Sequence, residues 1–255
     1  MDTRIGPLLR SITRIFPSSH YAILSLFLFI GLELLFVIHR WLFLLLFLLL
    51  GILVIGVFLI RSEEGAQFHS TQTILPRLAA FGFAGFEVYL PFTALLHVYF
   101  IACAIVFFTI LKYGAKQAWP TWNMVISLTV LFAALVPTIG WRFLFYAPVW
   151  GMLALIFVIV TLLSFQSFLR YVQSTSEAGL IALALGFTLT EIAWILQFLP
   201  LHFIVQAGFL VATYYTTSQL ATIAIEKNIE RKTIIEYGLV GGGAIILLVL
   251  TANWS

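Results

Sequence analysis

Aspartate is almost absent from this chain: the only one is Asp2, which lies outside every long apolar stretch. Enzymes that bind magnesium through clustered aspartates, such as polyprenyl-diphosphate and alcohol-phosphatidyl transferases, need several such carboxylates at their sites. Intramembrane aspartyl proteases need aspartates within their spans. The sequence therefore excludes all three classes.

Other chemical signatures are missing as well. The four lysines lie at the ends of apolar stretches, so no retinal Schiff base can form inside a helix bundle. The chain contains no G-x-x-x-x-G-K-[ST], H-E-x-x-H or G-x-S-x-G motif. Histidines 39, 97 and 202 match no ligand spacing for a metal or haem. Cys103 is the only cysteine, so it forms no intrachain disulfide. We expect no cofactor and no metal.

Charge is also scarce, and apolar residues dominate. Charged residues make up 9% of the chain, apolar residues 62%, and the mean hydropathy is +1.11. The apolar residues form blocks of about 20, the length at which an α-helix crosses the hydrocarbon layer. The pattern predicts an all-α, polytopic transmembrane bundle of about nine spans: 21–38, 41–60, 73–90, 92–112, 122–141, 147–169, 177–199, 202–224 and 234–252.

The block at 73–90 is short and carries Glu87, so it either spans the membrane or is re-entrant. The orientation of every later span depends on which of the two is true. If it spans and the N-terminus is cytoplasmic, 11 of the 13 Lys+Arg lie inside, and only Arg40 and Arg142 lie outside. If it is re-entrant, everything after it inverts and most basic residues fall outside. The positive-inside rule favours nine spans with the C-terminus outside. The net charge of +3 thus reflects orientation signals and head-group contacts rather than nucleic-acid binding.

Residues 1–19 precede the first block and form a basic segment of their own. Apolar residues recur there at helical spacing, with Arg4, Arg10 and Arg14 off that stripe. The segment is either an amphipathic helix in the head-group region or a basic orientation signal. It has no small-residue cleavage site typical of a signal peptide. We therefore expect two parts, residues 1–19 and a single helical domain over 20–255.

Five polar side chains fall within the predicted spans, where such groups are costly and often functional. The predicted topology places all five in the outer half of the membrane. We hypothesise that several line one polar cavity open to the outside and act as proton carriers, general acids or hydrogen-bond donors. The alternatives are snorkelling carboxylates and ordinary interhelical hydrogen bonds. The five residues are Glu33, Glu87, His97, Glu191 and Gln206.

Small residues predict where helices approach closely. Ala178, Ala182, Gly186 and Thr190 recur at every fourth position of one block, and such a strip lets a neighbouring backbone come near. Similar clusters occur in two other blocks, with Ala79, Ala80, Gly82, Ala84 and Gly85 in one and Gly241, Gly242 and Gly243 in the other. We expect tight packing within one bundle.

The C-terminal part resembles a known but uncharacterised family. The run from Glu191 through Trp194 to Pro200, the pair at 214–215 and the terminal block ending at Trp254 carry the likeness, over about residues 150–254. Members of that family are multi-pass membrane proteins of small-genome, candidate-phylum bacteria. The resemblance implies a bacterial inner membrane. It marks Glu191, Trp194 and Pro200 as motif positions without giving them a role.

Three functions remain open. The first is a transporter or permease-like protein for a small or lipidic molecule, which the lack of a catalytic motif favours. The second is an integral membrane enzyme acting on a lipid-linked substrate, which needs two polar groups within hydrogen-bond reach. The third is a non-catalytic assembly or scaffold subunit. The expected partners are membrane lipids and either a partner subunit or further copies of the chain.

Overall fold

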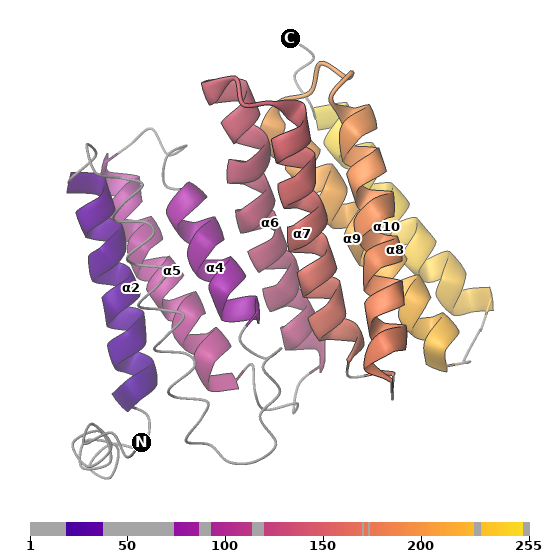
Figure 1. Cartoon of the computed structure of the whole chain (residues 1–255), viewed down its shortest axis with the longest axis horizontal. Helices are drawn as coiled ribbons and strands as arrows, with labels where there is room; N and C mark the ends of the chain where they lie inside the picture. Colours follow the sequence, from indigo (N-terminus) through magenta and orange to yellow (C-terminus); the bar gives the residue numbers. More distant parts are fainter. Residues whose placement is uncertain are drawn as a thin grey trace. The chain divides into compact units, whose positions relative to one another are not determined.

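A computed structural model describes residues 19–37, 74–86, 93–113, 120–169, 171–172, 174–226 and 231–251 (Figure 1). These residues form eight α-helices. They are α2 (Ser19–Val37), α4 (Ile74–Phe86), α5 (Thr93–Tyr113), α6 (Pro120–Phe145), α7 (Val149–Phe168), α8 (Thr175–Leu196), α9 (Phe203–Glu226) and α10 (Arg231–Thr251).

Each of these helices coincides with one of the predicted apolar blocks, which confirms the all-helical class. Helix α4 has 13 residues, about 20 Å at 1.5 Å per residue, and so does not by itself show that 73–90 crosses a membrane. The predicted block 41–60 and Glu87 lie outside the described residues, as does the basic segment up to residue 18.

The chain divides into two compact units, Met1–Asn123 and Met124–Ser255, and each is considered by itself. The expectation of a single domain over 20–255 stays a prediction. In the first unit α2, α4 and α5 pack against one another. Leu28 and Leu32 of α2 and Phe100 and Phe107 of α5 are completely buried. The Tyr99 hydroxyl donates to the Phe83 carbonyl oxygen at 2.8 Å, which ties α5 to α4.

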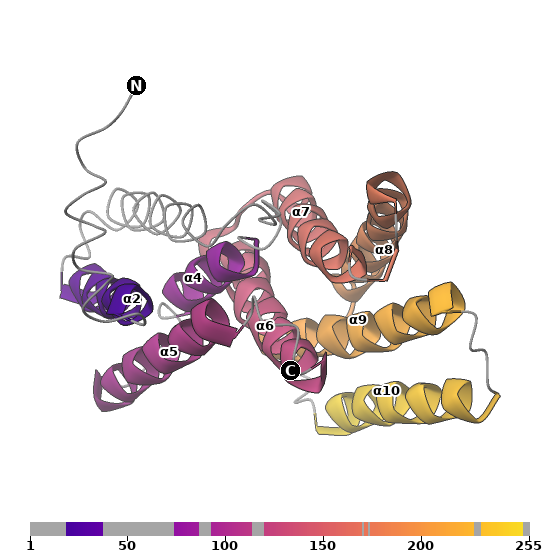
Figure 2. The ribbon, with the colours of Figure 1, turned by 90° about the horizontal axis from the view of Figure 1, so that it is seen from below.

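In the second unit, α8 packs against both α7 and α9, and α9 packs against α10 (Figure 2). Helices α6 and α9 run antiparallel, because two contacts link opposite ends. The rings of Phe143 and Phe203 lie 6.3 Å apart, and Gln219 Nε2 donates to Met124 Sδ at 3.4 Å. The turn from α6 to α7 passes through Tyr146, whose φ of 52° is in the left-handed region. That residue is 91% exposed.

The close approach predicted for small residues is confirmed between α7 and α8. Ala178 and Ala182 are completely buried, and a Cβ added at Gly186 would overlap Thr161 Oγ1 and crowd Phe157. Of the three glycines at 241–243, only Gly241 is in such a contact, with Thr216 Oγ1 of α9. Gly242 and Gly243 have no neighbour within 4 Å of an added Cβ in the described part of the chain. Small residues therefore set the spacing of two helix pairs in this unit.

Three helices of the described chain are long and apolar enough to cross a membrane, over Met124–Phe143, Val149–Phe168 and Thr175–Leu196. Their outward faces are apolar too. On α8, Leu180 is 68% exposed and Phe187 60% exposed. A helix with so much apolar surface on its outward face needs either a protein interior or lipid around it. These three helices are therefore suited to a hydrocarbon environment.

Candidate functional site

Glu33 and His97, two of the five predicted polar residues, are brought together in the first unit. His97 Nδ1 lies 2.9 Å from Glu33 Oε1, so that α5 and α2 are joined by a side-chain hydrogen bond. The two residues are 64 positions apart in the chain. Glu33 is 27% exposed and His97 54% exposed. The pair is therefore partly covered by the helices but accessible from one side.

The surroundings of this pair are aromatic. The His97 ring meets the edge of Phe100, with ring centroids 6.3 Å apart. Tyr99 packs against both Phe86 and Phe100, at 5.6 and 6.0 Å between centroids. When Glu33 is ionised, the Nδ1–H of His97 donates to it, and Nε2 of the neutral ring is then a hydrogen-bond acceptor. The arrangement can carry a proton or orient an imidazole base.

Glu191 is placed differently from that pair. It lies on an exposed part of α8 and has no hydrogen-bond or ionic partner among the described residues. Its motif neighbour Trp194 is 50% exposed and packs edge-on against the Phe198 ring, at 6.0 Å between centroids. The structure thus does not join Glu191 to Gln206. Convergence of several of the five polar residues on one cavity stays a prediction, and Glu87 lies outside the described residues.

Gln206 is fully buried at the start of α9 and holds the turn between α8 and α9. Its Nε2 donates to the Leu201 carbonyl oxygen at 2.9 Å. Its Oε1 accepts from Gln197 Nε2 at 3.0 Å. The Gln197 Oε1 is buried and has no hydrogen-bond partner within the described part of the chain. Gln206 is therefore a structural polar anchor that leaves one acceptor of Gln197 unsatisfied.

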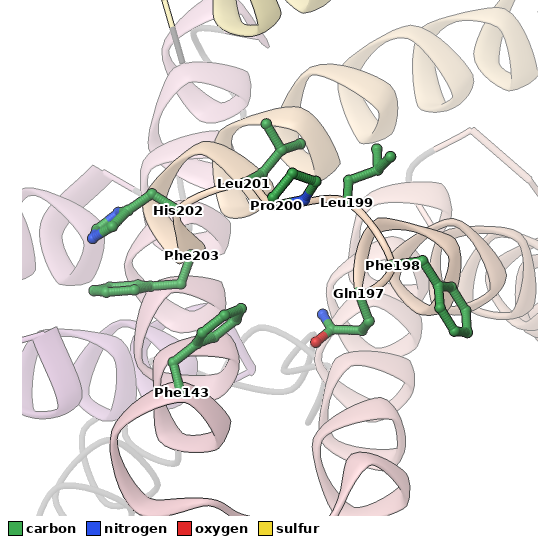
Figure 3. Close-up of a pocket in the computed structure, with 8 residues that line it drawn as sticks. All are labelled: Phe143, Gln197, Phe198, Leu199, Pro200, Leu201, His202 and Phe203. Carbon is green, nitrogen blue, oxygen red and sulfur yellow. The ribbon is translucent and has the colours of Figure 1, made fainter. Parts of the chain in front are cut away.

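A pocket of about 430 Å³ lies at this turn, lined by Phe143 and by residues 197–203 (Figure 3). The Gln197 amide extends toward the Phe143 side of the pocket, whereas the Phe198 ring points the other way (Figure 3). The His202 ring lies over that of Phe203, with centroids 4.2 Å apart. The pocket is a half-open depression, because four of its lining residues are exposed: Phe198, Leu199, Pro200 and His202.

Sequence reasoning missed Gln197 and Phe143 as members of this site. Gln197 lies inside the motif run, nine positions before Gln206 with Pro200 between them. A glutamine on each side of a proline turn could have suggested the pairing. Phe143, on α6, gives no such signal, because its place depends on how α6 packs. Among the described residues no three His, Cys, Asp or Glu side chains are grouped so that they could hold a metal ion.

With this geometry established, the molecule can be classed as an all-helical protein with three helices able to cross a membrane. Its residues 120–251 match the family described as "Protein of unknown function (DUF5656)". Because the match covers more than half of the 255 residues, the chain belongs to this family. The expected kinship with an uncharacterised family is thereby confirmed. No curated protein and no solved structure is significantly similar to the chain.

Proposed function

We propose that the chain is a multi-pass protein of a bacterial inner membrane, with nine spans, the N-terminus inside and the C-terminus outside. The proposal is supported by the three long apolar helices and by the apolar outward faces of the shorter ones. The distribution of Lys and Arg supports the orientation, with 11 of 13 on the cytoplasmic side. Membrane lipids are the partners that the apolar outward faces of these helices need.

The orientation can be tested by thiol labelling, since the chain has a single cysteine, Cys103, and it is buried. In a Cys103→Ala background, Tyr146→Cys tests the turn between α6 and α7, and Ser176→Cys tests the start of α8. An impermeant maleimide applied to intact cells should label residue 146 strongly and residue 176 only after permeabilisation. The reverse pattern would show that the second unit is inverted, as expected if 73–90 is re-entrant.

Within that topology we propose a transporter or permease-like function for a small or lipidic molecule. The observation that carries it is the hydrogen-bonded pair of Glu33 and His97 between two apolar helices. Ionisable groups at membrane depth are costly, and paired acidic and histidine side chains are a common element of ion and proton pathways. Partial exposure of both residues gives a substrate or proton access to the pair.

This function predicts a charge-moving activity that depends on the pair. The full-length protein is reconstituted in liposomes, which are adsorbed to a solid-supported membrane. Pools of small molecules are then added together with a change of pH, and the electrical current is recorded. We expect transient currents with some pools, and Glu33→Gln or His97→Asn should reduce them about ten- to a hundredfold, the worth of a charge-assisted hydrogen bond. Glu236→Gln is the matched control, because that carboxylate is exposed on α10. Currents that survive both substitutions would remove the pair from the pathway.

A membrane enzyme acting on a lipid-linked substrate is the second candidate, because the same pair meets its geometric requirement. His97 would be the base and Glu33 the residue that orients it, at their 2.9 Å separation. Turnover of a lipid-linked substrate without any current, lost in His97→Asn, would favour this candidate. Absence of both current and turnover would favour a scaffold that acts through a partner subunit or further copies of the chain.

A further inference from the structure

One face of α8 is exposed along its whole length and has the residue spacing of a helix-pairing surface. The helix lies at the edge of the second unit, where it packs against α7 and α9 (Figure 2). Exposed residues recur on it at alternating steps of four and three, the spacing with which two helices contact each other in a left-handed pair. These residues, the α8 stripe, are Leu180, Ala184, Phe187, Glu191, Trp194 and, in the turn after the helix, Phe198.

Glu191 is the polar member of the α8 stripe, and lipid alone does not satisfy it. The neighbouring hydroxyl of Thr188 donates to the Ala184 carbonyl oxygen of its own helix at 2.9 Å. Glu191 has no hydrogen-bond or ionic partner among the described residues. Helical side chains tilt toward the N-terminus, so Glu191 is directed away from the nearer end of α8, at Leu196, and toward the membrane interior. Polar groups at such depth pair with other polar groups.

The neighbouring helices offer Glu191 no cation. No Lys or Arg occurs at 143–169 or at 171–226, the ranges that contain α7, α8 and α9. A protonated carboxyl donates one hydrogen bond and also accepts, so a second carboxyl complements it. Two copies of a chain related by a two-fold axis along the membrane normal bring the same residue of each to the same depth. A second copy therefore supplies the complementary group.

We propose that two copies of the chain pair through the α8 stripe, with their Glu191 carboxyls hydrogen-bonded to each other within the membrane. Ala184 has a small side chain, which lets the two helices approach closely at that level. Glu191 fixes the register of the pair, because one polar residue in an otherwise apolar helix contact is satisfied in a single alignment. The remaining members of the stripe supply apolar contact area.

Two large rings of the stripe are already held in place. Phe187 packs against Phe157 of α7 at 4.8 Å between ring centroids, and Trp194 against Phe198 at 6.0 Å. Because these rings are ordered before association, pairing costs less conformational entropy. The inference rests on α8 being a membrane span, as proposed above. An inverted labelling pattern at residues 146 and 176 would leave two copies parallel, so a wrong orientation and a failed pairing are distinguishable.

The first test is disulfide cross-linking of the purified full-length protein in liposomes over a series of protein-to-lipid ratios. In a Cys103→Ala background, Leu180→Cys should cross-link into dimers even at low ratios, because the stripe places residue 180 beside its counterpart. Leu239→Cys on α10 is the matched control, since Leu239 is 69% exposed and Leu180 68%. It should cross-link only where copies are crowded. Equal cross-linking at the two positions, or none at residue 180, would overturn the proposal.

The second test changes Glu191 in the Leu180→Cys background. Glu191→Leu should weaken dimer formation about tenfold, the worth of an interhelical hydrogen bond in a membrane. Glu191→Gln should preserve it, because an amide also donates and accepts. Both changes lie on an exposed face, so circular dichroism should stay unchanged. Full dimer formation by Glu191→Leu would remove the carboxyl from the contact. Equal loss in both variants would contradict self-pairing and indicate a cationic partner.

Discussion

Replacing Gly186 by leucine is expected to lower the free energy of unfolding by about 3 kcal/mol, at the upper end of overpacking costs. The reason is the close contact of α8 with α7, where even one added carbon would overlap Thr161 Oγ1 and crowd the Phe157 ring. Threonine has two χ1 rotamers in a helix, so its hydroxyl can turn away, but the Phe157 ring still crowds the added side chain. Titration of the purified protein from mild detergent into SDS measures the change.

The control for this prediction is Gly243→Leu, because no atom of the described residues lies within 4 Å of an added Cβ at Gly243. Both substitutions gain similar helix propensity, so their difference isolates the packing of α8 on α7. A pair of smaller substitutions tests whether the contact can be relieved. Gly186→Ala alone should lower the free energy of unfolding, whereas Gly186→Ala combined with Thr161→Ala should be nearly neutral. That rescue is expected because the Thr161 hydroxyl is buried and has no hydrogen-bond partner among the described residues. Equal stability of Gly186→Leu and Gly243→Leu would contradict the close contact.

Replacing Gln206 by leucine is expected to have the second large effect. Gln206 is fully buried, and its loss strands two groups, the Leu201 carbonyl oxygen and Gln197 Nε2. Each stranded group costs about 1–3 kcal/mol when it stays buried. The free energy of unfolding in the same SDS titration should fall accordingly. Hydrogen exchange should increase at the turn between α8 and α9.

The matched control is Gln219→Leu, since among the described residues Gln219 donates to a thioether sulfur alone, and sulfur is a weak acceptor. It should cost less than about 1 kcal/mol. A double-mutant cycle with Gln197→Leu sharpens the result. Because each partner is stranded only when the other is missing, the double variant should be less destabilised than the sum of the two single variants. Additive costs would show that the two glutamines do not depend on each other.

Sequence by itself determined where the helices lie. Blocks of about 20 apolar residues must be helical wherever lipid offers no partner to backbone amides, so composition alone placed every described helix. It also found the face of Ala178, Ala182 and Gly186, because only small side chains permit close backbone contact and their four-residue spacing is visible in the chain. The polar residues could be identified by the same reasoning, since few occur within apolar blocks.

Only the tertiary structure decided which of these polar residues meet. Helices that are apolar on every side carry no periodic signal for which face packs inward, so their rotation cannot be read from composition. The rotation of each helix about its axis, and the helices against which it packs, place Glu33 against His97, expose Glu191 and bury Gln206. The unsatisfied oxygen of Gln197 follows in turn from the way the chain reverses between α8 and α9. Which side chains become partners thus depends on how the helices pack, and the local sequence of an apolar helix does not show this.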